Sequence, residues 1–271
     1  MRIVSLTCSN TEILAALGLG EALVGVDDHS DWPEGLLASL PRLGPDLQID
    51  LDALEALHPD LVLASLTVPG HETIVEGLEA RGIPHLALDP SSVEDICRDI
   101  EAIAHRAGVP QRAAAVVAEL QAALAPSRLP AAPDAPRILI QWWPRPVIAP
   151  GRESWASEAV RAAGGLHVLD HEDVKSRPLE DAEVAALAPD ALVIAWCGVE
   201  PAKYRTDVVY RNPAFRDIPA VANGQVFCIP EAFLGRPGPR LVHGVDALRR
   251  VVEHVREGRA APDHGRLQEQ D

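Results

Sequence analysis

Two segments of this sequence, 130 residues apart, follow the same plan. LHPDLVLA at 57–64 and LAPDALVI at 187–194 each end a helical stretch at Pro-Asp and continue as a short apolar run. Short apolar runs that alternate with helical stretches are typical of a parallel β-sheet covered by helices. Because the plan occurs in both halves of the chain, the sequence predicts two similar α/β lobes.

The other expected strands follow the same alternation. They are RIVSL at 2–6, ALVGV at 22–26, DLVLAS at 60–65, HLALD at 85–89, RILIQ at 137–141 and QVFCIP at 225–230. After the first of them, the pattern Ser9-Asn10-Thr11-Glu12 predicts the capped start of a helix that stops at Gly18. The first lobe is expected to span residues 1–108 and the second 137–256, with a terminal amphipathic helix over 239–255.

Residues 109–136 are expected to join the lobes. QRAAAVVAELQAALA predicts a helix after Val109-Pro110, and the Pro-rich SRLPAAPDAP leads into the second lobe. A helix of about 16 residues reaches about 24 Å, which is enough to bridge two lobes. The tail over 257–271 has almost nothing to bury and is expected to be flexible.

Charge and missing motifs exclude several functions. Lys+Arg 24 against Asp+Glu 40 gives a net charge of -16, which disfavours nucleic acids and anionic membrane surfaces as partners. No run approaches the roughly 18 apolar residues that insert into a membrane. No export signal is visible, which predicts a cytoplasmic protein, with the periplasm or cell surface as the alternative if a signal was removed.

The chain also lacks the common signatures of enzymes and metal sites. Its four cysteines form no CxxC pair, and the P-loop, HExxH and GxSxG motifs are absent. Neither a metal centre nor a catalytic cofactor is predicted, and the chain is expected not to be an enzyme.

Parallel sheets bind ligands beyond the carboxyl ends of their strands. Residues suited to ligand contact follow the expected strands of both lobes: Cys8, His29, Trp32 and Leu66 in the first, and Trp142, Trp143, Trp196 and Phe233 in the second. Nine of the ten aromatic residues lie after residue 130. The aromatic wall of a site is therefore expected mainly in the second lobe.

The adjacent indoles of QWWPRP, at 141–146, need an explanation, because neighbouring residues of a strand point to opposite faces. Pro144 is expected to end regular strand pairing, so that Trp142, Trp143 or both turn toward a ligand. Packing in the core or between the lobes is the alternative for such large aromatic side chains.

The chain resembles the cobalamin-type substrate-binding proteins of ABC importers. Four stretches carry the resemblance in the same order: SLTCSNTEILAALGLGEALVGVDDHSDWP, LPRLGPDLQIDLDALEALHPDLVLAS, APGRESWASEAVRAAGG and GRPGPRLVHGVDAL. The likeness runs from about Arg2 to Val255. It implies two Rossmann-like lobes joined by a single long α-helix, and a monomer that binds a corrinoid such as cobalamin in the cleft between the lobes, without catalysis.

The resemblance also implies particular site residues. Ligand contacts fall on His29 and Trp32 in the first lobe, and on Trp142, Trp143, Trp196, Phe233 and Arg236 in the second. The residues that would dock on a transporter permease are Glu72 and Glu200. Cys8 stands where the family usually has proline, and Leu66 where an aromatic residue can occur. Because of these departures, an iron siderophore or haem remains the alternative ligand.

Two residues of the first lobe carry further hypotheses. His29 is interpreted as a ligand contact and, more sharply, as an axial ligand of cobalt, against a solvated loop histidine. Cys8 is expected beside a helix N-terminus, where a thiolate is stabilised. A cytosolic cysteine-dependent enzyme is therefore the alternative from a different functional class.

Overall fold

The computed structural model describes residues 1–267, which form two compact units. Unit 1 holds residues 1–90, 94–120 and 237–239, and unit 2 holds 91–93, 121–236 and the described chain from 240 onward. These limits differ from the expected ones at 108 and 136, because helix α6 contributes to both units and the short segment 237–239 belongs to unit 1. Both units have the α/β structure that the alternation predicted.

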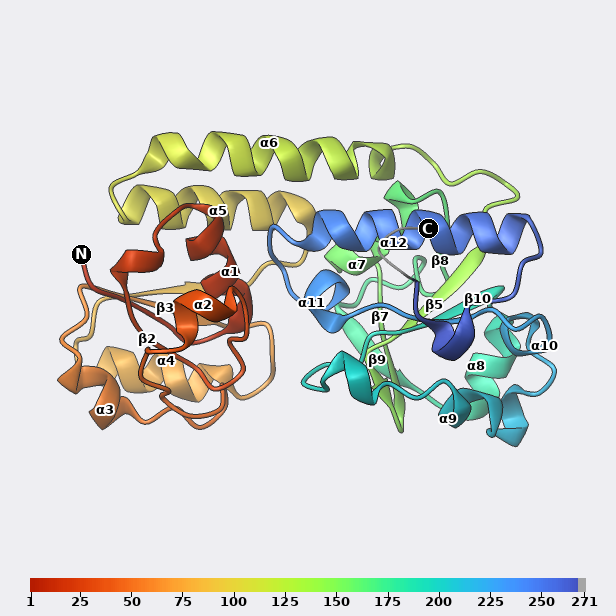
Figure 1. The fold of residues 1–271 in the computed structure, drawn as a ribbon, viewed down its shortest axis with the longest axis horizontal. Helices are drawn as coiled ribbons and strands as arrows, with labels where there is room; N and C mark the ends of the chain where they lie inside the picture. Colours follow the sequence, from red (N-terminus) through yellow and green to blue (C-terminus); the bar gives the residue numbers. More distant parts are fainter. Residues whose placement is uncertain (268–271) are drawn as a thin grey trace. The chain divides into compact units, whose positions relative to one another are not determined.

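Unit 1 carries the first parallel sheet and its helices (Figure 1). The elements are β1 (Ile3–Ser5), α1 (Cys8–Ala16), β2 (Leu23–Val26), α2 (Glu34–Leu37), α3 (Leu51–Ala56), β3 (Leu61–Ser65), α4 (His71–Ala80), β4 (His85–Leu88), α5 (Val93–Arg106) and the first part of α6 (Ala113–Leu124). The strands lie in the order β2-β1-β3-β4, all parallel.

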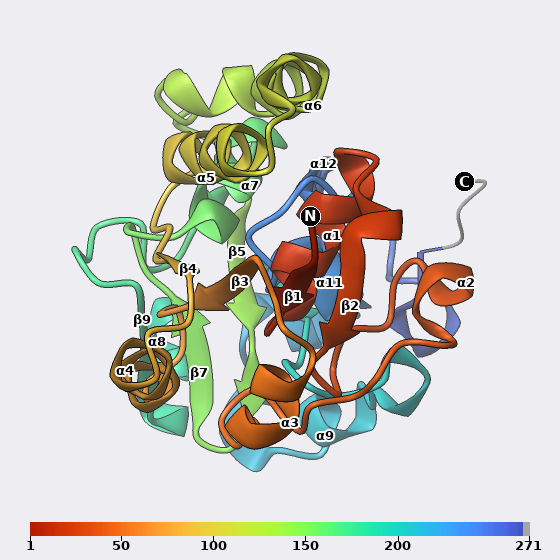
Figure 2. The ribbon, with the colours of Figure 1, turned by 90° about the vertical axis from the view of Figure 1, so that its left-hand side faces the viewer.

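The sheet of unit 1 is buried on both faces. Val4 and Val62 pack with Leu54 of α3 and Leu78 of α4, while their neighbours such as Ile3 are equally buried on the other side. Figure 2 shows α1 and α5 on one side of this sheet and α3 and α4 on the other. Burial on two faces explains why these strands are apolar throughout instead of alternating with polar residues.

Helix α1 begins two residues earlier than its capping pattern predicted. Its N-cap is Thr7, and no side chain caps it. The prediction of a capping box at Ser9–Glu12 was therefore wrong. These residues are buried, and Asn10 Nδ2 donates to the carbonyl of Ala64, so their polar atoms serve tertiary packing instead. The helix ends before Gly18 as predicted, because the positive φ of +66° there suits glycine.

Unit 2 carries the second parallel sheet and a smaller antiparallel one (Figure 1). The elements are β5 (Arg137–Gln141), β6 (Trp143–Pro144), β7 (Val147–Pro150), α7 (Trp155–Ala162), β8 (Leu166–His167), β9 (Ser176–Leu179), α8 (Asp181–Leu187), β10 (Ala191–Ile194), α9 (Asp207–Tyr210), α10 (Pro219–Ala222), β11 (Val226–Cys228), α11 (Glu231–Leu234) and α12 (Leu241–Arg256). The parallel order is β11-β10-β5-β8, and the antiparallel order is β6-β7-β9.

The antiparallel sheet was not predicted, and it overturns one expectation about QWWPRP. Pro144 does not end regular pairing, because it lies opposite Val147 in the hairpin of β6 and β7. Proline is tolerated there since β6 is an edge strand, where the missing N–H faces away from the sheet. Trp142 and Trp143 therefore stay within paired backbone.

The chain after α12 is more ordered than its composition suggested. The N–H of Ala261 donates to the carbonyl of Gly224, Arg266 forms a bridge with Cys228, and Gly265 is buried. The expected flexible tail therefore packs on unit 2 as far as this segment. Its last residues, 268–271, lie outside the described residues.

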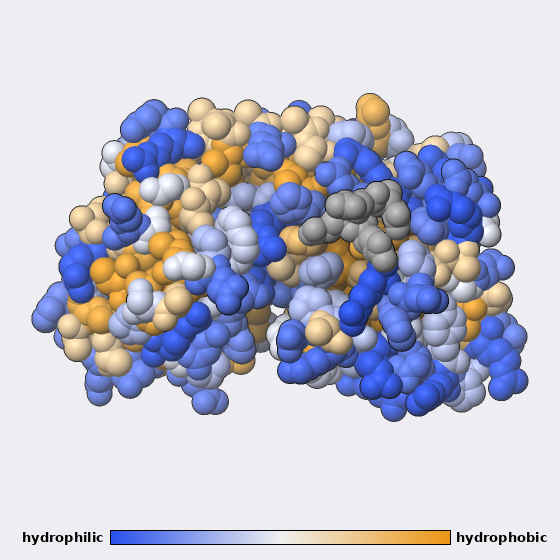
Figure 3. Space-filling view, viewed as in Figure 1, coloured by the Kyte–Doolittle hydropathy of each residue, from blue (hydrophilic) through white to orange (hydrophobic). Residues whose placement is uncertain are grey.

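The surface carries few large hydrophobic side chains. Figure 3 shows apolar residues of unit 1 reaching the surface among polar ones on the face that carries α2. Within residues 1–267, no helix is both long and apolar enough to cross a membrane.

A glycine in α12 tests the packing that positions α11. A Cβ on Gly244 would lie 2.1 Å from the carbonyl oxygen of Phe233, so Gly244→Ala must push the two helices apart. We expect this substitution to lower the free energy of unfolding by about 1–3 kcal/mol. Gly35→Ala in α2 is the matched control, because a Cβ there meets nothing within 4 Å. Urea unfolding that shows equal stability for both variants would contradict this packing.

Candidate functional site

Three loops meet beyond the carboxyl ends of the strands in unit 1. The loop after β2 carries His29, the segment before α3 carries Asp46, and α4 begins with His71 after the β3 loop. His29 Nε2 lies 3.7 Å from Asp46 Oδ1, and His71 Nε2 lies 3.3 Å from Asp46 Oδ2. Asp46 therefore ties the three loops together.

A buried polar network supports the loop after β2. Asp27 is fully buried, and its carboxylate accepts from the Ser30 hydroxyl at 2.5 Å and from the His29 N–H at 2.9 Å. Burial raises the pKa of the Asp27 carboxyl, while these hydrogen bonds oppose that rise. Arg42 Nη1 also donates to the carbonyls of Asp27 and Ser30. The hydrogen bonds made by Asp27 and Arg42 thus fix the backbone before and after His29.

The three loops of this histidine-carboxylate cluster also carry exposed apolar side chains. Among the seven large hydrophobic residues that the described chain exposes, Trp32, Leu47 and Val68 belong to the same three loops. A Cβ on Gly70 would lie 3.1 Å from Leu47 Cδ2, which places the second and third loops side by side. Exposed apolar residues grouped beside polar ones are typical of a ligand-binding surface.

The structure places the predicted residues of unit 1 at different depths. Trp32 is 39% exposed and the His29 side chain 47% exposed, so both are accessible. Cys8 and Leu66 are half-buried, at the first position of α1 and directly after β3. Asp46, Leu47 and His71 were missed by the sequence analysis, because nothing in their local pattern links them to a strand end.

The two tryptophans after β5 have different environments. Trp142 is half-buried, with its ring centroid 6.1 Å from that of Trp155, whereas Trp143 is 42% exposed. The Trp155 indole donates to the carbonyl of Leu234. Trp142 Nε1 is buried and makes no hydrogen bond within the described chain. An unpaired buried donor costs about 1–3 kcal/mol, which an acceptor on a ligand would recover.

Trp196 lies deeper than a ligand contact requires. Its side chain is 6% exposed and belongs to the core of unit 2, with Tyr204 at a ring distance of 5.7 Å. Its Nε1 donates to Gln141 Oε1 at 3.0 Å. The sequence expectation of cleft lining rested on the strand end and on the resemblance, and neither carried a signal for the Gln141 and Tyr204 partners.

Phe233 and Arg236 lie on and after α11. Arg236 is buried and its Nε donates to Glu231 Oε2 at 3.0 Å. Phe233 is half-buried. Its ring centroid lies 5.3 Å from that of His243, and the Arg240 guanidinium carbon lies over the ring, 4.8 Å from the centroid. Arg236 is thus already partly neutralised by a carboxylate.

The two predicted docking carboxylates are both exposed. Glu72 lies in the first turn of α4 and accepts from the Gly70 N–H, and hydrogen bonds from the backbone lower its pKa. Glu200 pairs with Lys203 at 3.1 Å. Both therefore present a negative charge to solvent, each in its own unit.

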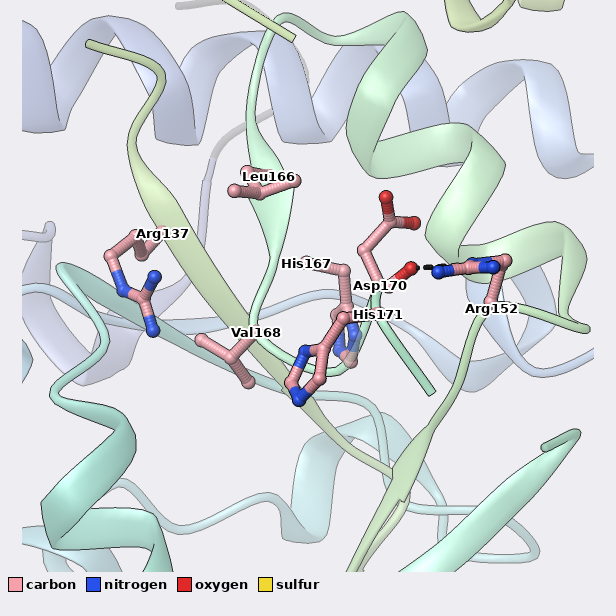
Figure 4. A pocket seen from close by; sticks show the side chains of 7 residues that line it. All are labelled: Arg137, Arg152, Leu166, His167, Val168, Asp170 and His171. Carbon is pink, nitrogen blue, oxygen red and sulfur yellow. Dashed lines mark hydrogen bonds between the residues drawn. The ribbon is translucent and has the colours of Figure 1, made fainter. Parts of the chain in front are cut away.

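A separate cavity of about 350 Å³ lies beside β8 in unit 2 (Figure 4). It is lined by Arg137, Arg152, Leu166, His167, Val168, Asp170 and His171. Arg137 begins β5 whereas Trp142 follows its last residue, so the cavity and the tryptophans lie at opposite ends of that strand. Burial lowers the pKa of His167 to about 3, which keeps its imidazole neutral. Within residues 1–267, no cluster of three metal-ligating side chains is present.

The Gln141–Trp196 hydrogen bond gives a direct test of the core position of Trp196. Gln141→Leu leaves the buried indole N–H unpaired, and we expect a loss of about 1–3 kcal/mol in the free energy of unfolding. The double variant Gln141→Leu/Trp196→Phe removes both partners and should regain part of that loss. A double-mutant cycle with zero coupling energy would show that the hydrogen bond is not formed.

Known proteins with similar sequences cover nearly the whole chain. A vitamin B12-binding protein from Vibrio campbellii is 27% identical over 260 residues, which are 95% of this chain and 91% of the relative. An ABC transporter substrate-binding lipoprotein from Bacillus subtilis is 26% identical and covers 93% of this chain and 79% of the relative. A solved periplasmic haem-binding protein from Roseiflexus sp. RS-1, in apo form, matches with a TM-score of 0.78 at 27% identity, over 94% of this chain and 98% of that one.

These likenesses agree with the arrangement of two α/β units described above. The family model for periplasmic binding proteins matches residues 3–233. The chain therefore belongs to the periplasmic binding protein family, whose members bind substrates without catalysis.

Proposed function

We propose that the protein is the substrate-binding component of an ABC importer and that its ligand is a metal chelate with a broad, largely apolar ring, in the first place a corrinoid such as cobalamin. Support comes from the vitamin B12-binding relatives, which match along nearly the full chain. The observation that carries the proposal is the pair of exposed indoles, Trp32 and Trp143, which follow strand ends in the two units.

Rigid indoles suit such a ligand. A flat ring with apolar edges gains contact area from tryptophan while little side-chain entropy is lost on binding. In unit 1, Leu47 and Val68 are also exposed, in the two other loops of the histidine-carboxylate cluster. In unit 2, the unpaired Trp142 Nε1 offers one hydrogen bond beside Trp143. We propose that both surfaces contact the ligand.

Haem or an iron siderophore is the second candidate. It is favoured by the solved haem-binding protein that matches at 27% identity. Two cations near the proposed contacts are already engaged, since Arg42 donates to the carbonyls of Asp27 and Ser30 and Arg236 pairs with Glu231. Strongly anionic siderophores need free guanidinium or ammonium groups, and neither Arg42 nor Arg236 offers one.

Family membership also bears on the role of Cys8 and on the compartment in which the protein works. It favours binding over the cysteine-dependent enzyme suggested by Cys8. The lipoprotein relative is a substrate-binding protein of an ABC transporter, and the solved haem-binding relative is periplasmic. We therefore propose the outer side of the cytoplasmic membrane as the working compartment, in place of the cytoplasm expected from the first residues.

Titration of the purified protein with cyanocobalamin, haemin and a ferric siderophore distinguishes the candidate ligands. We expect Trp143→Ala to weaken corrinoid binding by about thirtyfold, because an aromatic anchor contributes about 2 kcal/mol or more. Its melting temperature should stay near that of the parent, since the indole is exposed. Tyr210→Ala is the matched control, an aromatic residue of the same unit that is also 42% exposed. Failure of all three ligands to bind would refute the proposal.

Docking on a transporter permease is a separate proposal, on Glu72 and Glu200. We expect Glu72→Arg to weaken the complex with the transporter while ligand affinity is unchanged, because a favourable charge becomes a repulsive one. Glu79→Arg introduces the same charge at an exposed position later in α4 and should have little effect. Equal pull-down of the transporter by the two variants would contradict the assignment of Glu72.

A further inference from the structure

A short segment after α12 lies along the outer edge of β11, which is an edge strand of its sheet. Residues 259–266 form this segment, the C-terminal strap. The N–H of Ala261 donates to the carbonyl of Gly224 before the strand, and Arg266 forms a parallel bridge with Cys228 at its end. The strap therefore covers the open edge of the parallel sheet in unit 2.

The corresponding edge strand of unit 1 shows what this cover changes. The parallel strands follow in chain order as β1, β2, β3 and β4 in unit 1 and as β5, β8, β10 and β11 in unit 2, and the two sheets have the same spatial order. Strands β4 and β11 thus occupy the same place. The first three residues of β4 are half-buried, whereas Val226, Phe227 and Cys228 are all buried.

A glycine lets the strap lie directly on β11. A Cβ on Gly265 would lie 2.5 Å from the carbonyl oxygen of Val226 and 2.9 Å from Thr206 Cγ2, and the φ of Gly265 is +70°. Both the space and the backbone conformation therefore exclude a larger residue. Cys228 Sγ also donates to the carbonyl of His264 at 3.5 Å. The strap is thus fitted closely to this strand.

The side chain of Arg266 reaches a different loop. Its Nη2 donates to the carbonyl of Ala202 at 3.0 Å. Ala202 lies in the loop after β10, whose residues 198–203 are exposed or half-buried between the buried Trp196 and Tyr204. Within residues 1–267, this is the only hydrogen bond that links 198–203 to a segment outside the loop.

Unit 1 contains the same arrangement at another edge. Arg42 forms a parallel bridge with Val26, the last residue of edge strand β2, and its Nη1 donates to the carbonyls of Asp27 and Ser30 in the following loop. Because β2 and β11 occupy opposite edges of the shared topology, the similarity does not follow from the repeat of the fold. In both units, an arginine bridged to the end of an edge strand holds a loop by its carbonyls.

We propose that the C-terminal strap supports the loop after β10 and that Arg266 is a positioning residue, which holds Glu200 in place for docking on the transporter permease. The inference rests on the docking proposed for Glu200. This exposed carboxylate lies two residues before Ala202, so the hydrogen bond from Arg266 limits the positions it can take. A loop ordered before docking loses less entropy in the complex.

The first test uses the protein alone and measures amide hydrogen exchange by mass spectrometry. Exchange over 198–204 should be about 3–10-fold faster in Arg266→Ala than in the parent, the factor that corresponds to one net hydrogen bond. Gly265→Val should also speed exchange over 226–228, because it displaces the whole strap. Arg266→Lys keeps a donor and should restore most of the protection. Equal exchange over 198–204 in the parent and in Arg266→Ala would overturn the inference.

Two control variants match these substitutions. Arg205 is exposed and follows the same loop, but its guanidinium pairs with Asp207, so Arg205→Ala should leave exchange over 198–204 unchanged. Gly258 also has a positive φ, of +64°, and a Cβ there meets nothing within 4 Å. Gly258→Val therefore imposes a similar backbone strain without a clash on β11. If Arg205→Ala speeds exchange as much as Arg266→Ala, the role of the hydrogen bond is refuted.

The second test uses the complex with the transporter permease. Arg266→Ala should weaken it by about 3–10-fold, while the melting temperature stays near that of the parent because the side chain is exposed. In a Glu200→Ala background, the same substitution should have no further effect, since a positioning residue acts only through the residue that it positions. Additive effects of the two substitutions would contradict the proposed role of Arg266.

The outcomes separate this inference from the docking proposal. If Glu200→Ala leaves the complex unchanged, docking at Glu200 fails, and the role of Arg266 in docking fails with it. If Glu200→Ala weakens the complex but Arg266→Ala does not, docking stands and the positioning role of Arg266 is refuted.

Discussion

Parallel strands buried on both faces determine where this protein can hold any chemistry. In both units the strand residues are apolar on either side and covered by helices, so a polar side chain within a strand would need a buried partner. Functional groups are thereby confined to the loops beyond the strand ends. Asp27, His29 and Trp32 follow β2, while Trp142 and Trp143 follow β5.

Buried polar atoms keep those loops in place, and their hydrogen bonds offset the free energy lost when polar groups leave water. Taking the Asp27 carboxylate out of water costs several kcal/mol, and each hydrogen bond to it offsets on the order of 1.5–3 kcal/mol. The Ser30 hydroxyl donates to the Asp27 carboxylate, and Oγ1 of Thr11 in α1 lies 2.7 Å from Ser30 Oγ. Thr11, one of the polar residues of α1 that resembled a cap, is therefore part of the support for the loop after β2. A loop already ordered before binding loses less entropy when a ligand arrives.

The sequence predicted the parallel strands well because their signal is local. RILIQ and DLVLAS, for example, are apolar runs bounded by turns. Strand β5 occupies nearly the same residues as RILIQ, and β3 nearly the same residues as DLVLAS. The antiparallel sheet escaped prediction because β6 has only two residues and one is a proline. Asp46 and His71 were not predicted for another reason. Their contact depends on how three loops fold together, and no residue spacing in the sequence indicates it. Trp196 was assigned by its strand end and by the resemblance, and neither records its buried contacts with Gln141 and Tyr204.

The balance of charge around the proposed contacts argues for the kind of ligand more strongly than the aromatic residues do. Indoles bind any flat ring, whether corrinoid or haem, so they do not separate the two. Charged groups can separate them, and here Arg42 donates to backbone carbonyls and Arg236 pairs with Glu231, whereas Arg145 is exposed two residues after Trp143. A ligand with few negative charges therefore suits the two engaged guanidiniums better than a strongly anionic one does.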